Sequence, residues 1–166
     1  MQRFHRLDAA FFRVGESQDG LLVKFYAGEE YSEEELLSDF ERNGLQAWRL
    51  KRERRLLMRA EEDPLGGTRR EQLGRLIEEE GGEGMTVWAS FDWVRPVELE
   101  TVLEQQKRLS ELVDASQLVV KTAAIEEALD EWPASELRRV QSAHSAIILA
   151  SEDGLSLSRA TPMPPS

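Results

Sequence analysis

The stretch that most constrains the fold is 85–122, which has the pattern of a strand, a long helix and a second strand. Residues 85–91 are rich in the β-branched and aromatic types that strands prefer. Residues 96–113 carry leucine and valine on one broad face and charged side chains on the other, as a helix covering a sheet does. Residues 117–122 form the returning strand. Two strands joined by a covering helix run parallel, so the stretch predicts a parallel sheet.

The rest of the chain adds further elements to this unit. We expect strands over 10–14, 21–27, 45–50, 55–61 and 145–150, and helices over 33–43, 69–80, 123–132 and 134–143. Strands alternate with helices through the second half, which predicts an α/β three-layer sandwich with a mostly parallel sheet and helices on both faces. The middle of that sheet should hold 21–27, 85–91, 117–122 and 145–150.

Turn and cap residues set the expected boundaries. Ser32 with Glu35, and Thr68 with Glu71, have the spacing of capping boxes at helix starts. Gly44 predicts a left-handed stop after the first of these helices. Lys51–Arg54 would turn the pair 45–50 and 55–61. Asp153-Gly154 predicts a tight turn, after which 155–158 pairs back as an antiparallel edge strand.

The segment between Gly15 and Gly20 has two glycines spaced as in a phosphate-binding loop. That motif needs Lys and then Ser or Thr directly after the second glycine. Leu21 and Leu22 stand there instead, and a strand follows where the motif requires a helix. A hairpin-like turn between the strands 10–14 and 21–27 is therefore the better interpretation.

Length and composition indicate one globular domain over 1–159 and a disordered, proline-rich tail over 160–166. The chain has no cysteine, which excludes disulfides and thiolate metal sites. No apolar run approaches the length of a membrane span, and the first residues lack the pattern of a signal peptide. We therefore expect a cytoplasmic protein without membrane contact. The net charge of −11 argues against direct binding of nucleic acid.

A local basic cluster departs from this acidic balance. It consists of Arg49, Lys51, Arg52, Arg54, Arg55 and Arg59. One interpretation is a solvated hairpin tip balanced by the acidic helices. The other is a docking patch for an acidic partner protein or a phosphate.

Tests for catalytic or cofactor equipment are mostly negative. The two histidines, His5 and His144, lack the paired spacing of metal ligands, and no nucleophile motif of the G-x-S-x-G type occurs. We therefore expect no metal and no cofactor. Glu29, Glu30 and Asp92 could meet at the carboxyl edge of the sheet and act as acid and base. Coincidence also explains them, because the chain has 32 acidic residues.

From about 20 to 162 the chain resembles the MEDS family, the DcmR-type sensory domains. The parts that carry the resemblance are the run 89–93 (ASFDW), the helix 96–113, the strand 118–122 (LVVKT), the turn 131–133 (EWP), the helix ending at His144, and the run 146–154 (AIILASEDG). The resemblance implies a RecA/KaiC-like sandwich without a phosphate loop, and a role in sensing small molecules for signalling.

The chain departs from the family pattern at two places. The family's acidic residue would align with Ser90, while Asp92 stands two places on, on the same face of the strand. A full first strand and its helix are also hard to place before residue 20, which puts any pocket built from them in doubt.

These observations favour a sensory or regulatory module that binds a small ligand or a partner signalling protein, with a homodimer left open. Ligands of such sheets bind beyond the carboxyl ends of the strands. The expected pocket residues are Glu29, Ser90, Asp92, Trp93 and Thr122. Trp93 would stack on a flat ligand there, or would simply be a tryptophan of the core or its rim. The alternative function is a small hydrolase or transferase that uses carboxylates at the same edge.

Overall fold

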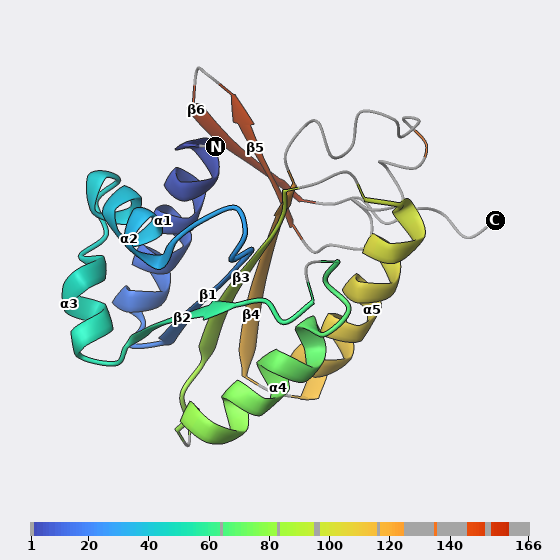
Figure 1. The fold of residues 1–166 in the computed structure, drawn as a ribbon, viewed down its shortest axis with the longest axis horizontal. Coiled ribbons are helices and arrows are strands. Elements are labelled where there is room, and N and C mark those ends of the chain that lie inside the picture. The colour runs from blue at the N-terminus through green and yellow to red at the C-terminus, as the bar shows by residue number, and fades with distance from the viewer. Residues whose placement is uncertain are drawn as a thin grey trace.

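The fold is an α/β architecture in three layers, with a parallel sheet between two layers of helices (Figure 1). The computed structural model describes residues 2–63, 65–82, 84–94, 97–115, 117–124, 135, 146–151 and 154–159. The elements in chain order are α1 (Gln2–Ser17), β1 (Leu21–Tyr26), α2 (Glu33–Arg42), α3 (Ala47–Arg52), β2 (Leu56–Ala60), α4 (Arg69–Glu80), β3 (Val87–Trp93), α5 (Leu99–Ala115), β4 (Leu118–Ala124), β5 (Ala146–Ser151) and β6 (Gly154–Arg159).

The main sheet has four strands in the order β2-β1-β3-β4, and every neighbouring pair is parallel. Val87 of β3 pairs with Leu21 of β1 on one side and with Leu118 of β4 on the other. The predicted unit of strand, helix and parallel strand over 85–122 is therefore confirmed as β3, α5 and β4. The carboxyl ends of the four strands lie at one edge of the sheet, because all of them run in the same direction.

The last two strands form a separate two-stranded antiparallel sheet. The predicted return of the chain after 145–150 is confirmed, since Ser151 pairs with Gly154 and Ala146 with Arg159. The prediction that 145–150 lies in the middle of the main sheet is wrong, and β6 is not an edge strand of that sheet. Because β6 follows β5 closely in the sequence, pairing the two costs little loop-closure entropy, whereas a place in the parallel sheet requires a distant partner.

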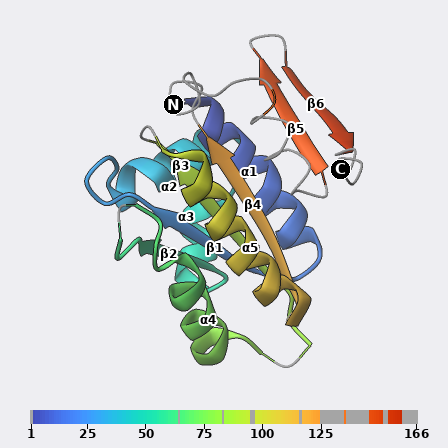
Figure 2. The same cartoon turned by 90° about the vertical axis from the view of Figure 1, so that its right-hand side faces the viewer.

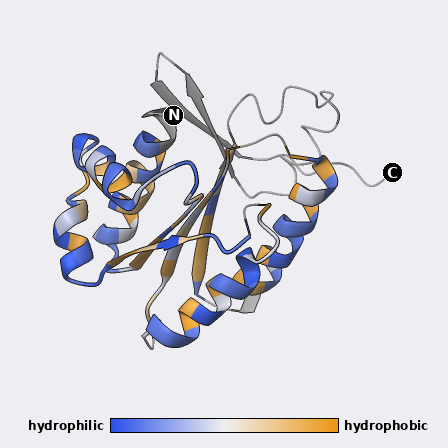
Figure 3. Cartoon of the chain, viewed as in Figure 1, coloured by the Kyte–Doolittle hydropathy of each residue, from blue (hydrophilic) through white to orange (hydrophobic). Residues whose placement is uncertain are grey.

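Alternate side chains along each strand point to opposite faces of the sheet and therefore belong to two different hydrophobic cores. Leu22 of β1 and Trp88 of β3 belong to the core under α1, α2 and α3, together with Phe12 and Phe40. The neighbouring positions on the strands face the other core, which α4 and α5 cover (Figures 1 and 2). Figure 3 shows the result, with mostly hydrophobic strands between helices that turn their hydrophilic sides outward.

Two predicted strands are helices. The run 10–14 lies inside α1, where the buried residues His5, Asp8 and Phe12 follow helical spacing. The run 45–50 overlaps α3, where Ala47 and Leu50 are buried three residues apart. In both runs the aromatic and aliphatic types suggested strands, but burial on one helical face decides the structure. Gly15 consequently lies in the last turn of α1 and Gly20 in the connection from this helix to β1, so the two glycines do not belong to a hairpin.

The two predicted helix starts differ in their caps. The Ser32 hydroxyl accepts a hydrogen bond from the backbone N–H of Glu35 at 3.2 Å, which confirms this N-cap. Thr68 makes no such bond, and its hydroxyl instead donates to the Gln72 side chain at 3.3 Å. The second capping box is therefore wrong, although α4 begins and ends where predicted. Gly44 adopts the expected left-handed conformation, with φ of 95°.

Gly15 and Gly74 provide a matched test of the packing between α1 and the sheet. A Cβ at Gly15 would lie 2.7 Å from Leu22 Cδ2 and 2.8 Å from Trp88 Cγ, while one at Gly74 would meet nothing within 4 Å. We expect Gly15→Ala to lower the free energy of unfolding by about 1–3 kcal/mol through overpacking. Gly74→Ala should raise it by about 0.5–1 kcal/mol through helix propensity. Urea unfolding measures both, and a stabilising Gly15→Ala would contradict this packing.

Candidate ligand pocket at the carboxyl edge of the sheet

A cavity of about 520 Å³ lies at the carboxyl ends of β1, β2 and β3 and reaches the first turn of α5. Its lining residues come from the segments that follow these strands and from the start of that helix: Ala27, Gly28, Glu29, Ala60, Glu61, Glu62, Leu65, Asp92, Trp93, Val94, Val97, Glu98 and Thr101. This is the place where open parallel sheets bind their ligands.

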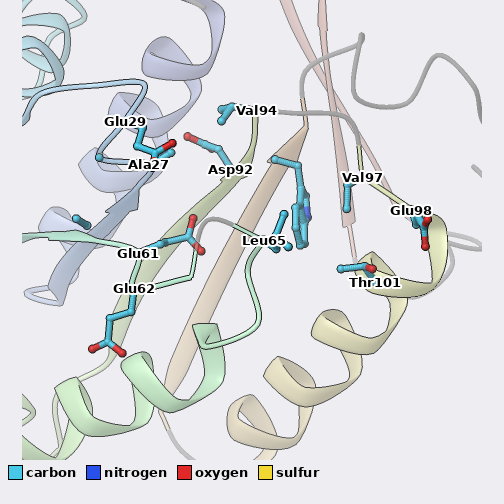
Figure 4. Close-up of a pocket in the computed structure, with 13 residues that line it drawn as sticks. Ala27, Glu29, Glu61, Glu62, Leu65, Asp92, Val94, Val97, Glu98 and Thr101 are labelled. Atoms are coloured by element: carbon cyan, nitrogen blue, oxygen red, sulfur yellow. The ribbon is translucent and has the colours of Figure 1, made fainter.

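The pocket has an acidic end and a more apolar end. Figure 4 shows the carboxylates of Glu29 and Asp92 directed toward one another, with Glu61 extending toward the same space and Glu62 pointing away. Val97, Glu98 and Thr101 lie on the opposite side, just before α5 and in its first turn. Leu65 and Trp93 also line the cavity, so it can contact both polar and apolar parts of a ligand.

A cluster of four charged residues lies at the base of the acidic end. Lys24 of β1 is fully buried, and its Nζ lies 2.5 Å from Asp92 Oδ2 and 2.8 Å from Asp8 Oδ2. Lys121 of β4 lies 2.8 Å from Asp8 Oδ1 and 3.9 Å from Asp92 Oδ1. The Ser90 hydroxyl donates to Asp8 and accepts from Lys24. Two cations and two anions thus compensate one another and link α1 to three strands.

The protonation of this cluster follows from its burial and its pairing. Burial alone would raise the pKa of Asp8, but the Lys121 and Lys24 ammonium groups outweigh it and hold that pKa well below its ordinary value. Burial would likewise lower the pKa of Lys24, and the Asp8 and Asp92 carboxylates reverse the shift and raise it. Both groups are therefore charged in the folded protein near neutral pH.

Arg69, the first residue of α4, positions two of the lining side chains. Its guanidinium donates to both carboxylate oxygens of Glu61, at 2.6 and 3.1 Å, and to the backbone carbonyl of Asp92 at 2.6 Å. It also lies 3.9 Å from the centre of the Trp93 ring and 5.0 Å from that of Phe91. Burial raises the pKa of Glu61 above its ordinary value despite the Arg69 guanidinium.

Three of the five predicted pocket residues line this cavity, namely Glu29, Asp92 and Trp93. Ser90 lies below it, fully buried against Asp8, and Thr122 pairs with Phe91 in β4 without lining the cavity. The expectation that residues 90 and 92 share a face of the strand is confirmed, because both side chains contact Lys24.

Sequence reasoning missed the contribution of β2 and of the loop after it. Glu61, Glu62 and Leu65 line the cavity because β2 is parallel to β1 and ends at the same edge. The prediction that 45–50 and 55–61 form a hairpin gave 55–61 an antiparallel partner, so its parallel pairing with β1 was not expected. Arg69 gave no signal, since an arginine at the start of an amphipathic helix is ordinarily a surface residue.

The basic cluster lies on α3, in the following turn and on β2, mostly before β2 begins and so toward the opposite edge of the sheet from the pocket. Four of its members form ion pairs within the chain: Arg49 with Glu16, Lys51 with Glu33, Arg54 with Glu80, and Arg55 with Asp19. Arg59 donates to the backbone carbonyl of Met58, and Arg52 is exposed. The predicted turn at Lys51–Arg54 is wrong for Lys51 and Arg52, which belong to α3.

Within the described ranges, no group of three or more His, Cys, Asp or Glu side chains is arranged to hold a metal ion. None of the helices in those ranges is long and apolar enough to cross a membrane. Several predicted features lie outside the described residues, apart from Ala123 and Ala124 in β4 and residue 135. They are the helices over 123–132 and 134–143, His144, and the tail at 160–166.

No family model, curated protein or solved structure matches the chain.

Replacing Lys24 tests whether the four-charge cluster supports the fold. We expect Lys24→Met to lower the free energy of unfolding by about 3–5 kcal/mol, because Asp8 and Asp92 would lose their buried counter-ion. Lys51→Met is the control, since its exposed pair with Glu33 at 3.1 Å should be worth less than about 1 kcal/mol. Similar losses for the two variants in urea unfolding would contradict a special role for the buried lysine.

The lowered pKa of Asp8 predicts how stability depends on acid. A carboxyl whose pKa is lower in the folded state stabilises the fold above its unfolded pKa of about 3.9 and loses this contribution as the pH falls. We expect the free energy of unfolding to drop below about pH 4. Asp8→Asn should be less stable at pH 7 but should show a shallower acid dependence. Parallel pH profiles for the two proteins would exclude Asp8 as a source of the effect.

Proposed function

We propose that this chain is a sensory or regulatory module without catalytic turnover, and that it binds a small organic ligand in the pocket at the carboxyl edge of the sheet. The observation that carries the proposal is the cavity of about 520 Å³ built from Glu29, Asp92, Trp93 and their neighbours. It has the size and mixed lining of a small-molecule site and lies where parallel α/β sheets bind ligands.

The contacts of the lining carboxylates favour recognition over catalysis. Asp92 is paired with the buried Lys24, and Glu61 is held by two hydrogen bonds from Arg69. General acid–base catalysis needs groups that take up and release protons during turnover. Carboxylates held by buried cations in this way are better suited to orienting a ligand through hydrogen bonds than to exchanging protons with it.

The position of the pocket supports a regulatory output. Its lining joins the ends of three strands, residues 62 and 65 after β2, and the start of α5, so one ligand would contact segments far apart in the chain. A ligand that binds the folded state in this way stabilises the arrangement of those segments relative to one another. The resemblance to the MEDS sensory domains agrees with such a role.

Two alternative functions compete with this proposal. Docking of a partner protein on the basic cluster is less favoured, because five of its six side chains already have partners within the chain. A hydrolase or transferase using Glu29 and Asp92 would convert a compound that binds in the cavity. Incubating each binder with the protein and measuring product formation separates this enzyme from a sensor.

A thermal-shift screen against nucleotides and small metabolites tests the proposed function. We expect at least one compound to raise the melting temperature, since a ligand at 100 times its dissociation constant adds about 2.7 kcal/mol to stability. Thr101→Phe should reduce or abolish the shift, because Thr101 lines the cavity and a phenyl ring there would narrow it.

Glu104→Phe, at an exposed position one turn along the same helix, is the control for adding a phenyl ring to α5. It should retain the shift. The proposed function fails if no compound stabilises the protein, or if the stabilisation is equal in Thr101→Phe and Glu104→Phe.

A further inference from the structure

The cavity passes over the end of β3 and reaches both sides of the sheet. Asp92 and Trp93 are consecutive in this strand, and both line the cavity. Asp92 points toward the α1 side, where it shares the Lys24 ammonium group with Asp8 of α1. Trp93 points to the other side, as alternation along a strand requires, and lies against Arg69 of α4. A ligand that fills the cavity therefore contacts two chemically different surfaces.

The carboxylates of the lining are largely balanced by cations of the same chain. The ion pairs are Asp92 with Lys24 at 2.5 Å, Glu61 with Arg69 at 2.6 Å, and Glu62 with Arg75 at 2.8 Å. Glu29 is not without a partner either, and Glu98 is exposed to solvent, where salt screens its charge. A charged ligand would enter this lining without a counter-ion of its own, and burying an unpaired charge is costly. The pairing therefore favours an uncharged ligand.

The two surfaces also differ in the hydrogen bonds that they leave unmade. Among the described residues, Asp92 Oδ1 accepts no hydrogen bond and lies 3.9 Å from Lys121 Nζ, while Trp93 Nε1 donates none. Both Asp92 and Trp93 are at least nine-tenths buried. Buried donors and acceptors are normally paired, so an unpaired acceptor and an unpaired donor in one lining indicate groups that a ligand satisfies.

The Trp93 ring is held in place by its neighbours, so its N–H has a fixed direction. The Arg69 guanidinium lies 3.9 Å from the ring centre and covers one face. A Cβ at Gly66 would lie 2.8 Å from Trp93 Cη2, so the loop before α4 also packs against the ring. A fixed donor suits an acceptor atom carried on an apolar body. Apolar lining for such a body comes from Leu65, Val94 and Val97.

We propose that the pocket binds an uncharged organic molecule with an O–H or N–H donor at one end and a hydrogen-bond acceptor on an apolar ring at the other. The donor end bonds to Asp92 Oδ1, the ring acceptor takes the Trp93 N–H, and the ring lies against Val97. Neither bond requires an ion pair to break, because Asp92 Oδ2 remains with Lys24. This inference rests on the proposed function and specifies its ligand class.

Five probes of similar size test the ligand class. The reference is 3-(3-pyridyl)propan-1-ol, which has a hydroxyl donor and a ring acceptor. In 3-phenylpropan-1-ol the ring acceptor is absent, and in 3-butylpyridine the donor is absent. The charged analogues are 3-(3-pyridyl)propan-1-amine and 3-(3-pyridyl)propanoate. Titration of each into the whole protein at pH 7, followed by ligand-observed NMR, gives the dissociation constants.

The reference alcohol should bind most tightly of the five probes. Loss of the acceptor or of the donor should each weaken binding by about two- to tenfold, the range of one hydrogen bond between uncharged groups. The amine and the carboxylate should bind at least about tenfold more weakly, since each brings a charge without a counter-ion. This comparison uses the native chain and depends on no variant being stable.

Trp93→Phe tests the ring acceptor, with Trp88→Phe as the matched control. Trp88 lies in the same strand and its Nε1 is also unpaired among the described residues, but Trp88 does not line the cavity. The readout is the dissociation constant of 3-phenylpropan-1-ol divided by that of 3-(3-pyridyl)propan-1-ol. Trp93→Phe should lower this ratio by about two- to tenfold, because it removes the N–H that distinguishes the two rings. Trp88→Phe should leave the ratio unchanged.

The outcomes separate this inference from the proposed function. If the amine or the carboxylate binds more tightly than the reference alcohol and Thr101→Phe weakens its binding, the pocket is a ligand site but the uncharged class is wrong. If the reference alcohol binds equally well to Thr101→Phe and Glu104→Phe, or if the ratio is the same in Trp93→Phe and the native chain, the inference is also wrong. If none of the five probes binds, the inference fails, while the thermal-shift screen decides the proposed function separately.

Discussion

The structure depends on one fully buried ammonium group, that of Lys24 in the middle of the sheet. An unpaired charge at this position would cost several kcal/mol, so the fold must bring carboxylates to it. Asp8 comes from α1 and Asp92 from β3, at 2.8 and 2.5 Å. Together with Lys121 of β4 they fix the docking of the first helix on three strands. The same pairing places Asp92 at the edge of the pocket.

Elements of the fold were predictable from the sequence where local residue patterns determine them, and were not where contacts between distant residues do. The unit over 85–122 was predictable because periodicity marks its two strands and its helix. A helical connection between two strands of one sheet then makes those strands parallel. The helices at 2–17 and 47–52 were not, because their aromatic and aliphatic runs satisfy local strand preferences while burial of one helical face decides otherwise. The strand 146–151 could pair with a distant strand or with its neighbour in sequence. The pattern of apolar residues along the strand does not specify which of these is the partner.

The pocket residues also divide into those that the sequence predicts and those that only tertiary packing brings to the site. Glu29, Asp92 and Trp93 follow or end strands that the sequence predicts, and the rule for parallel sheets brings them to one edge. Glu61 joins them only because β2 is parallel to β1, and Arg69 reaches them only through the packing of α4. The acidic character of the pocket therefore emerges from tertiary structure. In the sequence its carboxylates are a few of 32 acidic residues with nothing to set them apart.

The central claim is that the cavity at the carboxyl edge of the sheet holds a small organic ligand. A crystal structure of the protein grown with the compound that gives the largest thermal shift tests this most directly. The account predicts density for one molecule in the cavity, in contact with Trp93, Val97 and Thr101. An empty cavity at a saturating concentration of that compound, or a molecule bound only elsewhere on the protein, would contradict it.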